Sequence, residues 1–403
     1  MLNFQMKQKQ KNDMRKIRAQ YIFDGFRLRK NAMLVLSNTK VVSVIDLPEN
    51  SKEEAGVEFY NGIICPGFVN AHCHLELSHL ESHIPQGTGL PAFVSAVSQT
   101  RITQKFSLET CKKADEYMVE QGIVAVGDIS NSADSFPVKT QSSIAYHTFV
   151  ELFDLFRDST PVYTQGKELF RAYPIKNRVS LSPHAPYSCS NKLLAKISAH
   201  AAEYEYSVSI HNQEHESENE LFQQGTGLLY DMIYKNHGDV NLVSRAKSSL
   251  QSTLPKLEDC AHILFVHNIY TSEKDIAFLQ QMRERDSYTF VLCPRSNMYI
   301  NTLLPPVEMF LSHSIPMAIG TDSLASNTSL SILDELQCLQ NAFPTFTLEK
   351  LLQAATYNGA CALQMQSKIG SFTSGKKPGV ILLENLDLLQ LRITPKTKVR
   401  VLV

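Results

Sequence analysis

The pattern of apolar and polar positions changes its character along the chain. In the middle of the sequence, short β-rich apolar runs alternate with helix-like segments at 113–122, 192–204, 273–285 and 330–342. Including the run that precedes His72, there are eight such runs, the other seven being IVAVGDIS, SIAYHTFVEL, RVSLSPH, SVSIHNQE, ILFVHNIY, TFVLCPRSN and PMAIGTDS. This alternation predicts an α/β fold, a TIM-type (β/α)8 barrel whose parallel strands are buried on both faces.

Both ends of the chain carry short strand-like runs without helices between them. MLVLSN and VVSVIDL lie near the N-terminus, and GSFTSGKKPGVILLENL and KVRVLV lie near the C-terminus. We therefore expect residues 1–64 and 366–403 to form one small β-sheet domain beside a barrel of residues 65–365. Within the first of these ranges, residues 1–16 are predicted to be a flexible arm.

The polar segment 216–260 interrupts the barrel pattern between the fifth and sixth runs. It contains one helix-like stretch at 228–234, followed by polar residues. Loops of this length in a compact domain are commonly functional. We expect it to form a lid.

Composition and charge narrow the class of partner. Thirty-nine basic and forty acidic residues leave a formal charge of −1, so no basic face for nucleic acid or an anionic membrane is expected. The basic start lacks the apolar run of a signal peptide, and no apolar stretch has spanning length, which predicts a cytoplasmic protein. Eight cysteines without a C-x-x-C pair indicate neither a disulfide framework nor a zinc ribbon. A small-molecule substrate fits best, and a homo-oligomer is left open.

The segment PGFVNAHCHLELSHL carries the first candidate chemistry. His72 and His74 are separated by one residue, so at the end of an extended strand their side chains point to the same side. Imidazole is a good ligand for zinc and iron, but two ligands alone hold a metal poorly. The pair therefore needs partners from elsewhere in the chain.

Other polar residues also fall at the ends of predicted strands, which is the active-site face of a barrel. His211 and Asp322 could complete a divalent-metal site that leaves one position open for water. A bound cation lowers the pKa of water towards about 7, which indicates hydrolytic chemistry. Glu214 is placed to shuttle a proton, and His267 to orient the hydroxide. The remaining strand-end candidates are His184, Arg295 and Asn297.

The ordered motifs PGFVNAHCHLE, HNQEHESE, VHN, CPRSN and GTDS resemble the amidohydrolase superfamily, in its cytosine-deaminase-like branch with one metal ion. The resemblance implies that one Zn, or alternatively Fe, binds at His72, His74, His211 and Asp322. It also implies proton shuttling by Glu214 and hydroxide orientation by His267. In that family the two chain ends form a small β-sandwich beside the barrel.

The substrate is indicated by finer resemblances. The fourth predicted strand has no lysine to bridge two metals but offers His184, which resembles a substrate-contacting histidine. HCHLELS, with Glu76, and SPHAPYS resemble the aminofutalosine deaminases, which act on an aminated purine-type ring. Glu76, His184, Arg295 and Asn297 are therefore candidate substrate-binding residues. Arg295 could pair with a substrate carboxylate or form a structural ion pair.

Two rival functions stay open. A chlorohydrolase or a cyclic-amide amidohydrolase would use the same ligands on a different leaving group, so only turnover can separate them from a deaminase. A non-catalytic metal-binding scaffold is the alternative of another class, and retention of all the candidate ligands together with Glu214 and His267 argues against it.

Overall fold

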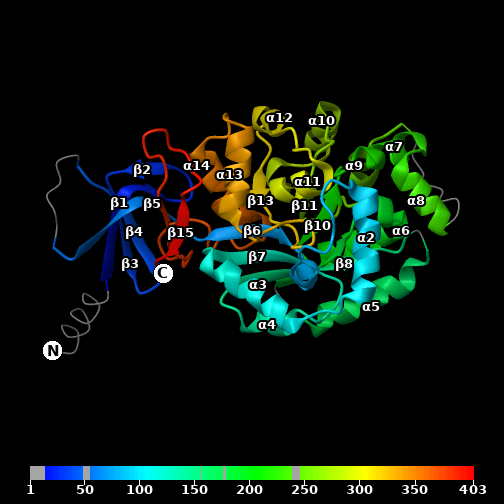
Figure 1. Ribbon diagram of the computed structural model, residues 1–403, viewed down its shortest axis with the longest axis horizontal. Helices are drawn as coiled ribbons and strands as arrows, with labels where there is room; N and C mark the ends of the chain where they lie inside the picture. The colour runs from blue at the N-terminus through cyan, green and yellow to red at the C-terminus, as the bar shows by residue number, and fades with distance from the viewer. Residues whose placement is uncertain (1–13, 49–54, 156, 176–177, 238–245) are drawn as a thin grey trace.

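A computed structural model describes residues 14–48, 55–155, 157–175, 178–237 and 246–403 (Figure 1). Its central strands form two four-stranded parallel sheets, in the orders β6-β7-β8-β9 and β10-β11-β12-β13. All seven predicted runs and the run before His72 are strands, and their bounds are β6 Phe68–Cys73, β7 Ile123–Ser130, β8 Ala145–Leu152, β9 Val179–Pro183, β10 Ser207–Asn212, β11 His262–His267, β12 Tyr288–Leu292 and β13 Met317–Ile319.

Both faces of these strands are buried, as the continuous apolar runs predict. In β11, Leu264 and Val266 belong to one apolar cluster, whereas Ile263 and Phe265 belong to another. Alternate side chains of a strand point to opposite faces, so each face packs into a separate part of the core. The sheets are thus held by burial on two sides.

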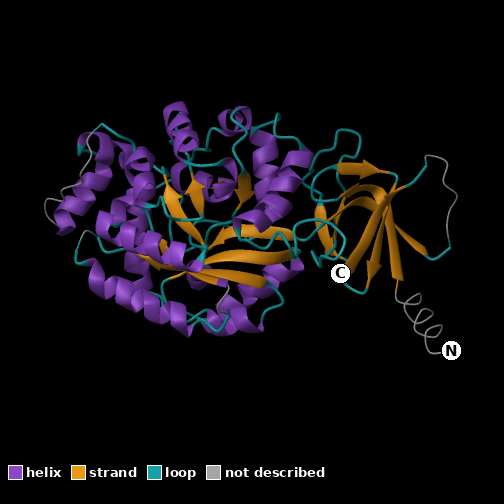
Figure 2. Cartoon of the chain, turned by 180° about the vertical axis from the view of Figure 1, so that it is seen from behind, coloured by secondary structure: helices purple, strands orange, loops and turns teal. Residues whose placement is uncertain are grey.

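Helices surround the sheets (Figure 2). Serine caps begin α3, α6, α10 and α13, where Ser107, Ser190, Ser272 and Ser331 accept a backbone hydrogen bond from the first turn. These and the other helices alternate with the strands. Their bounds are η1 Leu75–Leu80, α2 Leu90–Thr103, α3 Leu108–Glu120, α4 Phe136–Gln141, α5 Ser159–Ala172, η3 Pro186–Ser188, α6 Asn191–Tyr204, α10 Glu273–Met282, η5 Arg285–Ser287, α11 Pro294–Asn301, α12 Val307–Ser312, α13 Ile332–Ala342, α14 Leu348–Gln353, η6 Ala354–Asn358 and α15 Gly359–Ala362.

Strands from both ends of the chain share one further sheet. Its order is β15-β14-β5-β1-β3-β4, and β2 pairs with β1 (Figure 1). These seven strands form one sheet. Their bounds are β1 Met14–Phe23, β2 Leu28–Lys30, β3 Ala32–Ser37, β4 Lys40–Asp46, β5 Val57–Cys65, β14 Ile381–Glu384 and β15 Lys398–Val401.

The predicted N-terminal arm is too long by at least three residues. Met14, Arg15 and Lys16 pair with β3, and Arg15 forms an ion pair with Glu58 at 2.6 Å. The polar composition of this stretch concealed a strand whose alternate residues are buried. Residues 1–13 of the predicted arm lie outside the described residues.

The excursion after β10 is more helical than its sequence indicates. The predicted stretch at 228–234 lies within α8. Polar residues on either side of it are helical as well, and they form α7 and α9, each of which buries only one face. Residues 238–245 lie outside the described part. The bounds are α7 Glu216–Gln224, α8 Leu228–His237, α9 Ser249–Thr253 and η4 Leu254–Lys256.

A fully buried ion pair supports the turn that follows His74. Nζ of Lys139 lies 2.6 Å from Oδ2 of Asp128, and neither side chain is exposed to solvent. Oδ1 of Asp128 accepts a hydrogen bond of 2.7 Å from the backbone of Leu75.

In the described ranges, no helix combines the length and apolarity needed to cross a bilayer.

Candidate metal centre and active site

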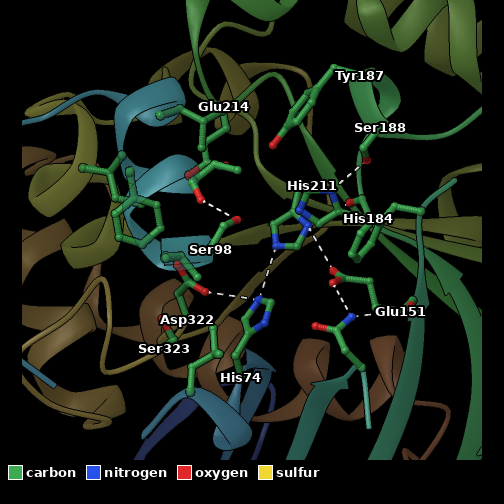
Figure 3. Close-up of a pocket in the computed structure, with 18 of the residues that line it drawn as sticks. His74, Ser98, Glu151, His184, Tyr187, Ser188, His211, Glu214, Asp322 and Ser323 are labelled. Carbon is green, nitrogen blue, oxygen red and sulfur yellow. Dashed lines mark hydrogen bonds and ion pairs between the residues drawn. The ribbon is translucent and has the colours of Figure 1, made fainter. Parts of the chain in front are cut away.

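A cavity of about 300 Å³ opens at the carboxyl ends of the parallel strands (Figure 3). Helices α2 and α8 supply an apolar wall that includes Phe93, Val97, Met232 and Ile233. Polar side chains line the rest, and they are His74, Arg101, Asn131, Glu151, His184, His211, Glu214, His267 and Asp322, together with Ser98, Ser188, Ser323 and Tyr187. The α8 segment of the predicted lid therefore borders this cavity.

Four donor atoms converge beside the cavity. Nε2 of His74 lies 3.2 Å from Nε2 of His72 and 3.4 Å from Nε2 of His211. Oδ1 of Asp322 lies 3.6 Å from Nε2 of His72 and 3.4 Å from Nε2 of His74. Four ligands at about 2.1 Å around a tetrahedral ion stand roughly 3.4 Å from one another. The spacing of these donor atoms fits a single metal ion.

Burial favours the neutral, metal-binding form of the imidazoles of His74 and His211. Burial lowers the pKa of His74 to about 4 and that of His211 well below its usual value. Nδ1 of His211 donates to the carbonyl oxygen of His184 at 2.8 Å, which leaves the lone pair of Nε2 facing the other donor atoms. The hydrogen bond thus fixes the tautomer that a metal ligand requires.

Asp322 is held in place by hydroxyl groups and by its backbone. Oδ2 accepts hydrogen bonds of 2.6 Å from both Ser296 and Ser326, so Oδ1 is left to face the histidines. The φ angle of Asp322 is +58°, a left-handed conformation that is uncommon for an aspartate and often found at functional sites. A parallel bridge between Cys73 and Asp322 places this residue beside the strand that carries His72.

The side chains of Glu214 and His267 face one another beside the four donor atoms. Oε2 of Glu214 lies 3.6 Å from Nε2 of His267. Burial, followed by the nearby Asp322 and Glu218 carboxylates, raises the pKa of Glu214 well above its usual value, which favours the protonated form of this carboxyl group. Burial lowers the pKa of His267 to about 4. A carboxyl group whose protonated form is favoured by burial therefore stands next to a histidine whose neutral form is favoured by burial.

Asn297 supports His267 and does not line the cavity. Nδ1 of His267 donates to Oδ1 of Asn297 at 2.8 Å, so the unprotonated Nε2 is directed towards Glu214. The direct contact of Asn297 with a substrate stays a prediction, and in the structure this side chain orients a histidine. His184 does line the cavity, and its Nδ1 lies 2.7 Å from the hydroxyl oxygen of Ser188.

Glu76, a second predicted substrate contact, is also withdrawn from the cavity. It is 3% exposed, and Oε1 accepts a hydrogen bond of 3.0 Å from the backbone of Asn131. Its Oε1 also lies 3.4 Å from Nη2 of Arg101. Because Asn131 and Arg101 both line the cavity, Glu76 positions two lining residues without forming part of the wall itself.

Arg295 does not line the cavity either. The backbone N–H of Arg295 donates to Glu335 at 2.9 Å, and its guanidinium group contacts Asn327, Thr328 and Asp334. These contacts correspond to the structural ion pair that was one of the two sequence interpretations. Arg295 lies in the first turn of α11, and its side chain points towards Asp334 and Glu335. Its position just after a strand was therefore not enough to place it in the cavity.

Sequence reasoning missed seven polar residues of the cavity, among them Glu151, Asn131 and Arg101. Glu151 and Asn131 stand at or just after the ends of β8 and β7, so the strand-end rule that located the other residues could have found them. Arg101 lies on α2, where neither a motif nor a strand end marks it. Among the described lining residues, it is the only lysine or arginine.

Three imidazoles and one carboxylate at the ends of parallel strands, beside a buried carboxyl group, are typical of metal-dependent hydrolases. The chain belongs to the amidohydrolase family, whose model matches residues 63–400. This match confirms the family and the predicted class of enzyme, a hydrolase acting on carbon–nitrogen bonds. The family and the donor group together support a divalent metal cofactor.

Named relatives and one solved structure resemble the chain over most of its length. It is 26% identical to a 5'-deoxyadenosine deaminase of Methanococcus maripaludis, covering 92% of this chain and 86% of that protein. It is also 26% identical to an aminodeoxyfutalosine deaminase of Nitratiruptor sp., covering 86% and 85%. The crystal structure of Helicobacter pylori aminofutalosine deaminase in complex with methylthio-coformycin has a TM-score of 0.80 at 21% identity, covering 94% and 93%. At that identity the structural likeness concerns the fold.

Proposed function

We propose that this protein is a metal-dependent deaminase of an aminated purine-type ring, of the adenosine or aminodeoxyfutalosine kind. The observation that carries the proposal is the buried Glu214 carboxyl group, which lines the cavity beside the group of His72, His74, His211 and Asp322 and lies 3.6 Å from His267. The names of the relatives as deaminases of adenine-type compounds support the same conclusion.

His72, His74, His211 and Asp322 would hold one divalent ion, which we propose to be Zn, with Fe as the alternative. Their donor spacing supports tetrahedral coordination, and nitrogen with carboxylate oxygen suits either metal. When bound, such an ion lowers the pKa of water towards about 7.

The residues of the chain would manage the protons. Deamination adds water to the amine-bearing carbon, breaks the carbon–nitrogen bond and releases ammonia, so at least one proton must reach the ring and another the amine. Glu214 would give its proton to the neighbouring ring nitrogen and, once ionised, take up a proton from the attacking water for delivery to the amine. As ammonia leaves, the proton of the newly added hydroxyl group would return to Glu214, which forms the oxo product and restores the acid. His267 would accept a hydrogen bond at Nε2 from that water, because Asn297 holds the proton on Nδ1.

We also propose that the two parallel sheets close into one (β/α)8 barrel. The proposal is supported at one junction by the bridge between Cys73 and Asp322. It is supported at the other junction by the hydrogen bond of 2.9 Å from the backbone of His211 to that of His184. The barrel would comprise residues 65–365, and 1–64 with 366–403 would form the small β-sandwich domain.

Ammonia release tests the proposed reaction. Metal-loaded protein should release ammonia from aminodeoxyfutalosine or 5'-deoxyadenosine and produce the corresponding oxo compound. Guanine, S-adenosylhomocysteine, a chlorinated triazine and a cyclic amide complete the panel. Ring opening or chloride release without ammonia release from any aminated purine would replace the deaminase with one of the two rival hydrolases, and no turnover of any compound would favour the non-catalytic scaffold.

The cavity also indicates what the ring carries. An apolar wall from α2 and α8 lies on the same cavity as Arg101, so an apolar appendage with an anionic group would be accommodated. Arg101→Met should raise KM for carboxylated aminodeoxyfutalosine by about 10- to 100-fold, the loss of a charged hydrogen bond. KM for 5'-deoxyadenosine, which has no carboxylate, should change little.

Arg295→Met is the matched control for this comparison. It removes the same charge outside the cavity, where Arg295 lies near Asp334 and Glu335. We expect it to lower stability and to leave the ratio of the two KM values unchanged. A changed ratio in the Arg295 variant, with none in the Arg101 variant, would return the carboxylate contact to Arg295.

A further inference from the structure

Glu151 has a buried carboxylate oxygen that accepts no hydrogen bond from the described part of the chain. The residue lies near the end of β8 and lines the cavity, and its side chain is 5% exposed. Oε2 accepts a hydrogen bond of 2.9 Å from the side chain of Asn131. Oε1 has no hydrogen-bond partner among the described residues. Buried carboxylate oxygens are costly to leave without donors, so this one is suited to receive a donor from a ligand.

Neighbouring groups do not supply that donor. Nδ1 of His211 lies 3.7 Å from Oε1 of Glu151, but this N–H already donates to the carbonyl oxygen of His184 at 2.8 Å. The same fact argues against a second metal ion on Glu151, His184 and His211, although their ligand atoms lie close together. Both nitrogens of His211 are engaged, Nδ1 with the carbonyl group and Nε2 with the first donor group.

The position of Glu151 relative to Glu214 restricts what the donor can be. Figure 3 shows the two carboxyl groups on opposite sides of the histidine group, both bordering the cavity. A purine-type ring that receives its proton from Glu214 would therefore direct a different part of the molecule towards Glu151. In a nucleoside, that part is the sugar, whose adjacent 2'- and 3'-hydroxyl groups are both hydrogen-bond donors.

We propose that Glu151 recognises the vicinal diol of a ribonucleoside, which makes it a specificity-determining residue. The inference rests on the proposed function, and it assigns a residue of the cavity to the sugar of the nucleosides proposed there. A carboxylate offers two oxygens with about four acceptor sites, so Oε1 can receive hydroxyl protons while Oε2 stays bound to Asn131. Asn131 is in turn fixed by the buried Glu76.

Comparison of 5'-deoxyadenosine with 2',5'-dideoxyadenosine tests this inference. For the wild-type enzyme, removing the 2'-hydroxyl should lower kcat/KM by about 10- to 100-fold, as expected for a lost hydrogen bond to a charged acceptor. In Glu151→Gln, the two substrates should differ by less than about threefold, because the charged acceptor is gone. Glu168→Gln, an exposed position on α5, makes the same change elsewhere and should keep the wild-type ratio.

Metal content and direct binding complete the test. An unchanged ratio of the two kcat/KM values in Glu151→Gln would overturn the inference. If both values also fall equally, with or without loss of metal, Glu151 is a support for His211. If the wild type binds 5'-deoxyadenosine by calorimetry but releases no ammonia, the proposed reaction fails separately. The ratio of the two Kd values, which should be about 10 or more and fall in Glu151→Gln, then decides the diol contact.

Discussion

Glu214→Gln should lower kcat by about 10²- to 10⁴-fold while leaving the fold and the bound metal unchanged. Glutamine keeps the shape of the side chain but can neither hold nor transfer the proton that burial retains on this carboxyl group. Steady-state ammonia release, with metal analysis of the same samples, measures both halves of the expectation.

The neighbouring Glu216 provides a matched control. It is exposed at the start of α7 and does not line the cavity, so Glu216→Gln makes the same chemical change two residues away. Its turnover should equal that of the wild type. Near wild-type turnover in Glu214→Gln would show that another group carries the proton.

His211→Ala should remove both metal and activity. The wild type is expected to bind one divalent ion per chain, and the variant would keep three of its four ligands, too few to hold the ion firmly. Metal analysis after gel filtration should find only a small fraction of one equivalent. Turnover should fall to the uncatalysed background.

His83→Ala is the control for this variant, because His83 is exposed and lies apart from the donor group. Circular dichroism should show that both variants are folded. Two tightly bound ions in the wild type, or full metal content in folded His211→Ala protein, would contradict the ligand assignment.

The sequence was most informative where a side chain belongs to a strand. The carboxyl ends of parallel strands meet at one edge, so the strand-end positions of His72, His211 and Asp322 predicted that they would meet in space. Spacing by one residue likewise predicted that His72 and His74 would share a side. These predictions depend on strand geometry alone, which the apolar runs determine.

Beyond a strand end, the sequence no longer determines where a side chain points. Arg295 and Asn297 lie on α11, where the rotation of the helix turns one towards Glu335 and the other towards His267. Arg101 reaches the cavity from α2, and the packing of that helix is a tertiary property. The helices beside α8 were missed because most of their residues are polar.

The sheet that both chain ends share has a consequence for biosynthesis. β14 pairs with β5, so Cys65 receives its partner Ile381 only after nearly the whole chain has left the ribosome. Until then, one edge of β5 presents free backbone groups next to the apolar Ile63 and Ile64, which is the kind of edge on which unfinished chains aggregate. A ribosome stalled before residue 381 would therefore yield an aggregation-prone fragment that depends on chaperones, even though every proposed metal ligand had already been synthesised.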